Sequence, residues 1–451
     1  MQNISPPCEG VSKILSKFER MHPSERMLHY CVEMPIPEGV LLFNLLTREM
    51  VLMTQEEWHN RFNNVYLKSH WFTVPKESND KEYVDLIRWV WQNRKKRECA
   101  ITNYTISPTT DCNARCYYCF QLASSRISMS EEVAYKVVRY IEEHCDGKKV
   151  KITWFGGEPL FNKRAIDLIC EGLTQKNIEY TSLAISNGYL FDSETVEKAV
   201  RNWKLTWVQI TLDGTESVYN KTKAYIYRQG NPYQVVMQNI DYLLQSGVAV
   251  VVRLNMDKQN ADNLLELIEE LARRFAGKKG LTVYAHHLFG AEGPMAELHS
   301  YEEWEALDNA INRLNKKIAE RGMSSSRGIR KTPKTNHCMA DSGESVTILP
   351  NGNIGLCDRF SESEFIGHID SDSFDQAVVN SWKERIPEIP ECATCFYYPD
   401  CMQLKKCASG SVCFEHLRRE KRRKVERQML TEYERWKSRE EPSVDEEMED
   451  C

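Results

Sequence analysis

Long apolar runs are absent from this chain. No stretch of the 451 residues is apolar for the length that a membrane span needs, and the amino terminus lacks the basic and apolar segments of a signal peptide. The net charge of −6 argues against a dominant nucleic-acid surface. Internal repeats and low-complexity linkers are also missing. We therefore expect a cytoplasmic protein of two or three domains, with neither membranes nor nucleic acids as partners.

Cysteine, in contrast, is abundant. The chain has 16 cysteines, which in a small secreted protein would predict disulfides. A chain of this length without a signal peptide instead favours a reducing compartment, where thiols serve as metal ligands. Ten of these cysteines fall into two groups that have ligand-like spacing.

The first group is Cys112, Cys116 and Cys119, in the run Cys-x3-Cys-x2-Cys after a strand-like segment at 101–106. Soft thiolates hold iron–sulfur clusters, and three closely spaced thiols can occupy three corners of a [4Fe–4S] cube. No fourth cysteine lies nearby, so one iron would remain open to another ligand. A structural zinc site usually takes four protein ligands. The spacing therefore favours a cluster with one open iron.

Polar or glycine-rich corners follow several strand-like segments downstream. These segments are 150–155, 183–185, 208–211 and 248–254. The corner residues are Gly156, Gly157, Glu158, Ser186, Asn187, Thr211 and Asp213. Amphipathic helical stretches lie between or after the strands, at 130–144, 163–173, 193–203, 233–244, 261–275 and 302–321. This alternation predicts βαβ units and a parallel sheet whose corners gather at the carboxyl edge.

The triplet, with Tyr118 before its last cysteine, resembles the cluster motif of the radical S-adenosylmethionine (SAM) enzymes. The resemblance implies a partial (β/α)6 TIM-like barrel, a SAM-cleaving [4Fe–4S] cluster and SAM itself as cofactors. Gly156-Gly157-Glu158 matches the motif for the SAM amino group in that family. Ser186, Asn187, Thr211 and Asp213 match positions around the SAM ribose and carboxylate.

The second group of cysteines is carboxyl-terminal and has seven members. They are Cys338, Cys357, Cys392, Cys395, Cys401, Cys407 and Cys413. This run resembles the SPASM extension of peptide-modifying radical SAM enzymes, which implies two auxiliary [4Fe–4S] clusters. By resemblance, the nearer cluster takes Cys338, Cys357 and Cys407, and the distal cluster takes the other four. The chain departs from the family by having five residues, not three, between Cys401 and Cys407, and a zinc ribbon on Cys392, Cys395, Cys401 and Cys407 is the alternative.

We divide the chain into an N-terminal module (1–97), a radical SAM core (98–325), a SPASM domain (326–415) and a charged helix with an acidic tail (416–451). Strands at 40–45 and 50–53 and a helix at 84–95 would fit a winged-helix-like module that binds a leader peptide at a strand edge. A structural cap on the barrel is the equal alternative. Residues 1–23 are weakly patterned, and the basic run 418–424 is expected to be a solvated helix face.

The expected activity is oxidative modification of a ribosomally made precursor peptide, with a carbon–carbon or thioether crosslink as product. A sulfatase-maturing enzyme that makes formylglycine, or a peptide epimerase, is the alternative, and a non-catalytic metal-binding protein is a third. Asp358 follows Cys357 and is expected to accept the substrate proton, because the sulfatase activators have an aspartate at the matching position. A flavodoxin or ferredoxin would supply electrons.

Overall fold

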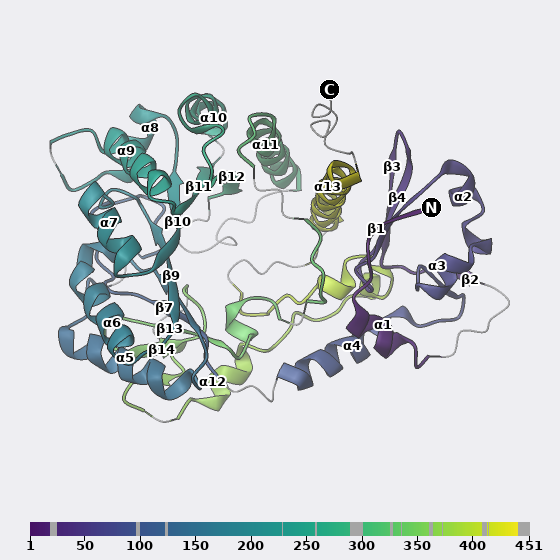
Figure 1. The fold of residues 1–451 in the computed structure, drawn as a ribbon, viewed down its shortest axis with the longest axis horizontal. Helices are drawn as coiled ribbons and strands as arrows, with labels where there is room; N and C mark the ends of the chain where they lie inside the picture. Colours follow the sequence, from purple (N-terminus) through teal and green to yellow (C-terminus); the bar gives the residue numbers. More distant parts are fainter. Residues whose placement is uncertain are drawn as a thin grey trace, which may run out of the picture.

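The computed structural model of the chain describes most of its residues. The described ranges are 1–18, 25–95, 100–121, 125–227, 229–257, 259–288, 301–324, 328–334, 336–359, 364–371, 373–407, 413 and 415–440. The acidic tail lies outside them. Two lobes face each other in Figure 1, a curved sheet covered by helices and a smaller lobe built from the N-terminal residues, with helix α13 between them.

The larger lobe is built on a nine-stranded sheet with the order β12-β11-β10-β9-β8-β7-β13-β14-β15. Its first six strands run parallel to their neighbours. Their bounds are β7 Asn103–Ile106, β8 Val150–Trp154, β9 Tyr180–Ser186, β10 Leu205–Leu212, β11 Ala249–Met256 and β12 Leu281–His287. The expected parallel sheet of alternating strands and helices is confirmed. Strand β12 carried no clear signal in the sequence.

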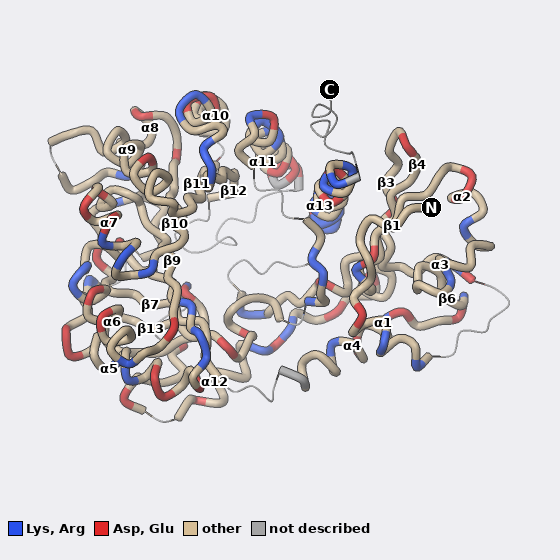
Figure 2. The backbone as a smooth tube through the Cα atoms, in the orientation of Figure 1, with Lys and Arg blue, Asp and Glu red and all other residues tan. Residues whose placement is uncertain are grey.

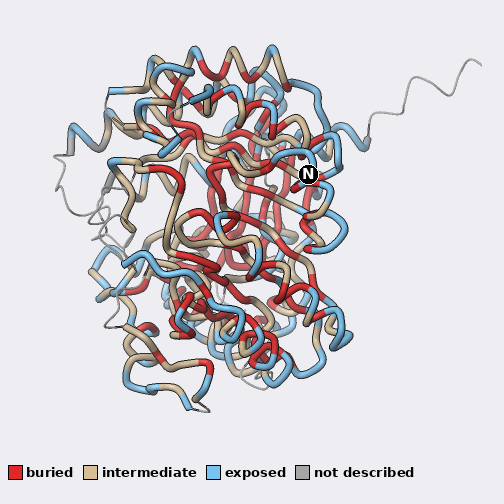
Figure 3. The backbone as a smooth tube through the Cα atoms, turned by 90° about the vertical axis from the view of Figure 1, so that its left-hand side faces the viewer, coloured by how far each residue is buried: buried red, intermediate tan, exposed pale blue. Residues whose placement is uncertain are grey.

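Helices cover the outer face of this sheet, and Figure 3 shows buried backbone inside exposed helix surfaces. Their bounds are α5 Glu131–His144, α6 Lys163–Gln175, α7 Ser193–Arg201, α8 Glu216–Lys223, α9 Pro232–Gln245, α10 Ala261–Phe275 and α11 Tyr301–Glu320. Side chains at their starts satisfy free backbone N–H groups. Ser130, for example, accepts from Val133 N at the start of α5. Six of these helices lie close to their expected ranges, and α8 is the exception.

The two faces of the sheet differ in polarity. On β10, Val208, Ile210 and Leu212 are buried in the main core, whereas Gln209 and Thr211 between them are half-buried. Because successive side chains of a strand point to opposite faces, the apolar set packs under the helices and the polar set lines the inner face. The polar inner face leads to the corner residues at the carboxyl ends of the strands.

The Cys-rich segment continues the same sheet. Strand β13 (Ser345–Ile348) pairs in parallel with β7, and β14 (Asn353–Gly355) and β15 (Gly367–His368) follow antiparallel. The remaining elements are short: η3 Met339–Asp341, α12 Gln376–Ser381, η5 Pro390–Thr394 and η6 Tyr398–Asp400. The first part of the region at 326–415 is therefore held by the barrel's own hydrogen-bond ladder.

The N-terminal lobe has its own core and an antiparallel sheet of order β1-β5-β4-β3. The strands are β1 Gln2–Ser5, β3 Cys31–Ile36, β4 Gly39–Asn44 and β5 Met50–Met53, with a separate pair β2 Glu25–Met27 and β6 Thr73–Pro75. The helices are α1 Glu9–Leu15, α2 Gln55–His59, η1 Arg61–Asn63, α3 Val65–Ser69 and α4 Asp80–Lys95. The expected hairpin at 40–53 is confirmed.

The amino-terminal residues are more regular than their weak pattern indicated. Residues 2–5 and 9–15 form β1 and α1, and Ile4, Val11 and Leu15 are buried in the N-terminal core. In helix α13 (Glu415–Glu440) the basic run 418–424 is half-buried or exposed, whereas Val425 and Met429 are buried in that same core. Figure 2 shows the basic residues of α13 beside the N-terminal strands. The last helix and the first strand thus belong to one packed lobe.

None of the helices in the described residues is long and apolar enough to cross a membrane.

Candidate active site

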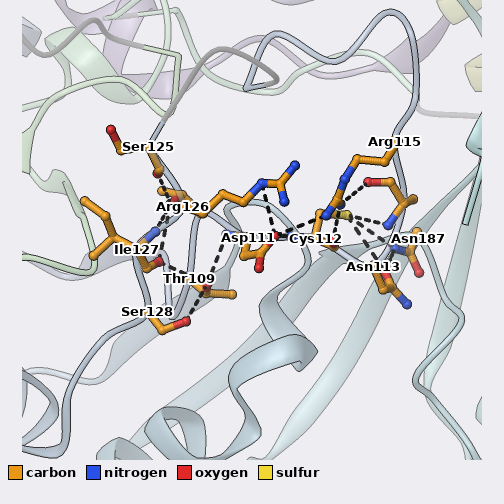
Figure 4. A network of polar contacts seen from close by, with 12 residues as sticks. Thr109, Asp111, Cys112, Asn113, Arg115, Ser125, Arg126, Ile127, Ser128 and Asn187 are labelled. Atoms are coloured by element: carbon orange, nitrogen blue, oxygen red, sulfur yellow. Dashed lines mark hydrogen bonds and ion pairs between the residues drawn. The ribbon is translucent and has the colours of Figure 1, made fainter. Parts of the chain in front are cut away.

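The first thiol group lies in the loop that follows β7. Figure 4 shows the polar contacts that hold Cys112: Asp111 accepts from the Cys112 backbone N–H at 2.8 Å, and Asp111 lies between the guanidinium groups of Arg115 and Arg126. The Ala114 N–H lies 3.4 Å from the Cys112 sulfur. Such N–H donors stabilise a thiolate more than a thiol. The loop therefore places a backbone N–H donor beside the Cys112 sulfur, where it would favour the thiolate form.

Gly156 and Gly157 are required by packing within the chain. A Cβ on Gly157 would lie 2.1 Å from the Asp111 carbonyl oxygen, and one on Gly156 would lie 2.3 Å from Ser107 Oγ. Backbone bonds from Gly157 N to Thr109 O (3.0 Å) and from Glu158 N to Asp111 O (2.9 Å) close this contact. The cysteine loop therefore occupies the space that side chains at these two positions would take.

Glu158 is fully buried and joins the ends of two strands. Its carboxylate accepts from Ser186 Oγ and from the Asn187 N–H, both at 2.8 Å. Burial raises the Glu158 pKa to about 7, against the opposing effect of these hydrogen bonds. The acidic corner after β8 and the polar corner after β9 are therefore one connected unit.

Asn187 links this unit to the first thiol group. Its Nδ2 donates to Asn113 Oδ1 at 2.7 Å and lies 3.8 Å from the Cys112 sulfur. Figure 4 shows Asn187 directed at Cys112 and Asn113. Two corners that were expected at one edge of the sheet from separate motifs are thus brought together.

A second connected unit joins the cysteine loop to the corner after β10. Asp213 Oδ1 accepts from Tyr118 OH at 2.8 Å and from Asn255 Nδ2 at 3.0 Å. Lys223 lies 3.1 Å from Asp213 Oδ2 and donates to Thr211 Oγ1 at 2.8 Å. Thr211 and Asp213 therefore meet at the position that strand order predicts.

Lys223 was not found by sequence reasoning. It is the last residue of α8, its side chain is 3% exposed, and its carbonyl oxygen lies 3.9 Å from the Cys116 sulfur. Burial opposes its charge, yet neighbouring Asp213 and Tyr118 keep its pKa well above the usual value. One lysine in a polar helix carries no local signal of such burial. It places a fixed positive charge beside Cys116.

Aromatic side chains connect the first and second thiol groups. Phe120 follows Cys119 and stacks on Phe155, with ring centroids 6.4 Å apart. Phe120 also contacts Arg359, whose guanidinium carbon lies 4.9 Å from the Phe120 ring centroid. Since Arg359 is two residues from Cys357, the segments that carry Cys119 and Cys357 touch through these side chains.

The seven carboxyl-terminal cysteines divide into two thiol groups. The second thiol group contains Cys338, Cys357 and Cys407, and the third contains the other four. The charges of these three thiols act on one another, and burial raises the Cys357 pKa to about 12. Asp358 is placed beside them, with Oδ1 3.7 Å from the Cys357 sulfur. Burial raises the Asp358 pKa, and Arg359 opposes this shift. Asp358 is therefore a half-buried carboxyl group next to a thiol group.

The third group contains Cys392, Cys395, Cys401 and Cys413. Burial raises the pKa of Cys395 and of Cys401. The charges of Cys392, Cys401 and Cys413 act on Cys395, and those of Cys392 and Cys413 act on Cys401.

The donor set suits iron–sulfur clusters. Each group gathers half-buried thiols whose charged forms are costly without a cation, and thiolates are the ligands such clusters take. Among the described residues, no three Cys, His, Asp or Glu side chains meet around a single metal-ion position. A cubane differs from a single ion because each of its thiolates binds a different iron, so its ligands are spread around the cube.

Comparison with known proteins assigns the core. Residues 106–271 match the radical SAM superfamily. The chain is 25% identical over 265 residues to a probable GTP 3',8-cyclase of Archaeoglobus fulgidus, over 57% of this chain and 80% of that protein. It is 25% identical over 169 residues to the sporulation killing factor maturation protein SkfB of Bacillus subtilis, over 37% of this chain and 39% of SkfB.

Solved structures resemble the fold over a longer span. Native anSMEcpe with bound AdoMet and Cp18Cys peptide matches with a TM-score of 0.54 at 15% identity, over 74% of this chain and 99% of that one. Streptococcus suis SuiB bound to precursor peptide SuiA matches with a TM-score of 0.51 at 13% identity, over 84% of this chain and 95% of SuiB. The fold and the thiol loop define a radical SAM domain. This chain carries that domain over residues 106–271.

Proposed function

We propose that this protein is a radical SAM peptide maturase that installs a carbon–carbon or thioether crosslink in a ribosomally made precursor peptide. The observation that carries the proposal is the match of residues 106–271 to the radical SAM superfamily, with three cysteines in the loop after β7 and seven more after the barrel. When bound, SAM and its cluster supply a 5′-deoxyadenosyl radical that abstracts hydrogen from the substrate.

The residues of this chain have separate roles in that chemistry. Cys112, Cys116 and Cys119 would hold the SAM-cleaving cluster. The second group, Cys338, Cys357 and Cys407, would hold the nearer auxiliary cluster, and the third group the distal one. The half-buried positions of these thiols exclude much of the solvent, as a reactive intermediate requires.

SAM would lie along the corners of β8, β9 and β10. Gly156, Gly157 and Glu158 would contribute backbone groups to the SAM amino end, because the Glu158 carboxylate is already bonded to Ser186 and Asn187. Ser186, Asn187, Thr211 and Asp213 complete the expected set. The buried charge of Lys223 would favour an anionic group near Thr211.

Asp358 would accept the proton that the oxidised substrate loses. Its position beside Cys357 supports this role, since electron and proton would leave the substrate at neighbouring places. An ion pair with Arg359 that holds the loop is the alternative. The N-terminal module would bind the precursor leader, and a cytoplasmic flavodoxin or ferredoxin would be the reductant.

The peptide substrate is supported by the names of two similar proteins, a maturation protein and a structure bound to a precursor peptide. The likeness to anSMEcpe with a Cys-containing peptide keeps formylglycine formation as the alternative, and epimerisation is a third peptide reaction. The products distinguish these functions. A crosslink removes two hydrogens from the peptide, whereas an epimer has unchanged mass.

The central test is SAM cleavage by the reconstituted protein under anaerobic, reducing conditions. We expect 5′-deoxyadenosine from the unmodified chain and none from the variant with alanine at Cys112, Cys116 and Cys119. That variant should retain the iron of the two other groups. Continued SAM cleavage by the triple variant would disprove the assignment of the first group.

Substrate class is tested with the same preparation. Peptides encoded next to the gene, and GTP as the nucleotide control, are each incubated with enzyme and SAM and analysed by mass spectrometry. Loss of two hydrogens from a peptide supports the proposal when fragment ions also show two residues joined, because serine oxidised to formylglycine loses two hydrogens as well. Conversion of GTP alone would replace it with nucleotide chemistry.

A further inference from the structure

Two arginines of the N-terminal module bind the loop that carries Cys395 and Cys401. Arg48, whose side chain is 2% exposed, binds both carboxylate oxygens of Asp400, with Nη1 3.0 Å from Oδ2. Arg48 lies at a positive φ of 68° in the turn between β4 and β5. A buried arginine in a constrained turn is therefore committed to a residue that directly precedes a thiol ligand.

Arg88 of α4 holds the same loop through its backbone. Its Nη2 donates to the carbonyl oxygens of Tyr398 and Cys401, the latter at 2.8 Å. Its guanidinium carbon lies 4.6 Å from the Tyr398 ring centroid. One planar guanidinium thus fixes the end of η6 and the main chain of Cys401, a task that suits arginine better than lysine.

Tyr398 extends this contact across the interface. Its ring stacks on Tyr30 of the module at 6.2 Å, and its hydroxyl donates to Glu388 at 2.8 Å. Glu388 in turn lies 3.2 Å from Lys81. Lys81 and Arg88 share one face of α4, seven residues apart. The contacts form a continuous interface between α4 and the third thiol group.

The positive charge of Arg88 lies close to the main chain of Cys401, because its Nη2 is 2.8 Å from the Cys401 carbonyl oxygen. A cluster becomes more negative when it is reduced, so a nearby buried cation favours the reduced form. Removing the cation should lower the reduction potential.

We propose that Arg88 is a positioning residue for the distal cluster, and that the N-terminal module is a clamp required for this cluster to assemble at its working potential. This inference rests on the proposed assignment of Cys392, Cys395, Cys401 and Cys413 to iron. It gives the module a role apart from leader binding.

The test uses the full chain with alanine at Cys112, Cys116 and Cys119, so that only the auxiliary clusters contribute. Adding alanine at both Cys395 and Cys401 leaves only two of the four thiols, and so identifies the distal signal in the EPR spectrum and its share of the iron. Arg88→Gln removes both the positive charge and the planar set of N–H donors. Arg88→Lys keeps the charge but removes the planar donor set. The matched control is Arg26→Gln, because Arg26 is a half-buried arginine of the same module that binds Asp80 with both arms, at 2.9 Å each, away from the loop.

We expect Arg88→Gln to lose iron from the distal site. In the clusters that remain, the ratio of reduced to oxidised cluster at a fixed potential should fall about tenfold, a shift of about 59 mV for one electron. Arg88→Lys should lose iron but keep the potential, and Arg26→Gln should change neither.

Two results would overturn the inference: an Arg88→Gln variant with unchanged iron and potential, or an Arg26→Gln variant with the same losses. Full iron retention in the variant with alanine at both Cys395 and Cys401 would reject the distal cluster itself and the clamp with it. SAM cleavage by the unmodified chain reports on the proposed function independently of these results.

Discussion

Tyr118 donates its hydroxyl hydrogen to Asp213 at 2.8 Å, which joins the cysteine loop after β7 to the corner after β10. The same Asp213 oxygen, Oδ1, also accepts a hydrogen bond from Asn255 Nδ2. The other oxygen, Oδ2, lies 3.1 Å from Lys223 Nζ. Tyr118 lies between Cys116 and Cys119 in sequence, so its bond to Asp213 fixes the loop against the inner face of the sheet. The site is held by contacts between strand ends that are far apart in the chain.

Gly157→Ala should destabilise the protein by about 1–3 kcal/mol. The added Cβ would lie 2.1 Å from the Asp111 carbonyl oxygen, and backbone atoms cannot rotate away. The cysteine loop should move with Asp111, so SAM cleavage should fall as well. Chemical unfolding and 5′-deoxyadenosine formation measure the two effects.

The matched substitution is Gly147→Ala, where the Cβ meets no atom within 4 Å although φ is +66°. Gly157 is not among the glycines with a positive φ, so its loss reports the contact with Asp111, whereas Gly147→Ala reports backbone strain alone. A Gly157→Ala variant as stable as the unmodified chain would contradict the contact explanation.

Lys223→Met should cost about 3–5 kcal/mol, because it leaves the Asp213 carboxylate buried without its cation. Adding Asp213→Asn to the same chain should recover part of this loss, since the unpaired charge is then removed. Urea unfolding of the single and double variants measures the difference. A double variant that is no more stable than Lys223→Met would contradict the ion-pair explanation.

Glu33→Pro should weaken precursor binding if the module binds the leader at the outer edge of β3, which pairs with no other strand in the described residues. The Glu33 carbonyl accepts from Arg422 on the outer side of this edge strand, so its N–H points outward too. Pro35 already lacks a donor there. We expect at least a tenfold loss of affinity, measured by fluorescence anisotropy with a labelled precursor.

Glu33→Gln keeps the backbone donor and is the control for side-chain effects. Iron content and uncoupled SAM cleavage should be unchanged in both variants. A point substitution is preferable to deletion of the whole module, because deletion would also remove Arg48 and Arg88. Unchanged precursor affinity in Glu33→Pro would favour the structural cap.

Asp358→Asn keeps the shape of the side chain and removes its basicity. We expect full iron content and SAM cleavage, with product formation reduced about a hundredfold or more, as for loss of a general base. Product yield is measured by mass spectrometry of the precursor. Normal yield would remove Asp358 from the mechanism, and lost iron would assign it to holding the loop of Cys357.

Much of the barrel was accessible from the sequence because strand and helix periods are local properties. The apolar pattern at 261–275 gave α10 at the same bounds, and the corner residues after β8, β9 and β10 do lie at one edge. Residues 1–15 showed only a weak pattern, because their few apolar side chains become informative only when the sheet they complete is known.

The purpose of the glycine pair was also beyond the sequence. Gly156-Gly157 marks a close approach, but the partner is the chain's own loop at 107–111. A local motif shows that a Cβ is excluded without showing which atoms exclude it.

The sequence by itself determined the thiol spacing, the alternation of strands and helices, and therefore the class of chemistry at the barrel edge. Only the tertiary structure decided that Lys223 is buried beside Cys116, and that Arg88 reaches Cys401 across 313 residues. Spacing along a chain reports periodicity and ligand type, which are local. The partner of a buried charge depends on how distant elements pack, because desolvation and pairing are properties of the folded core.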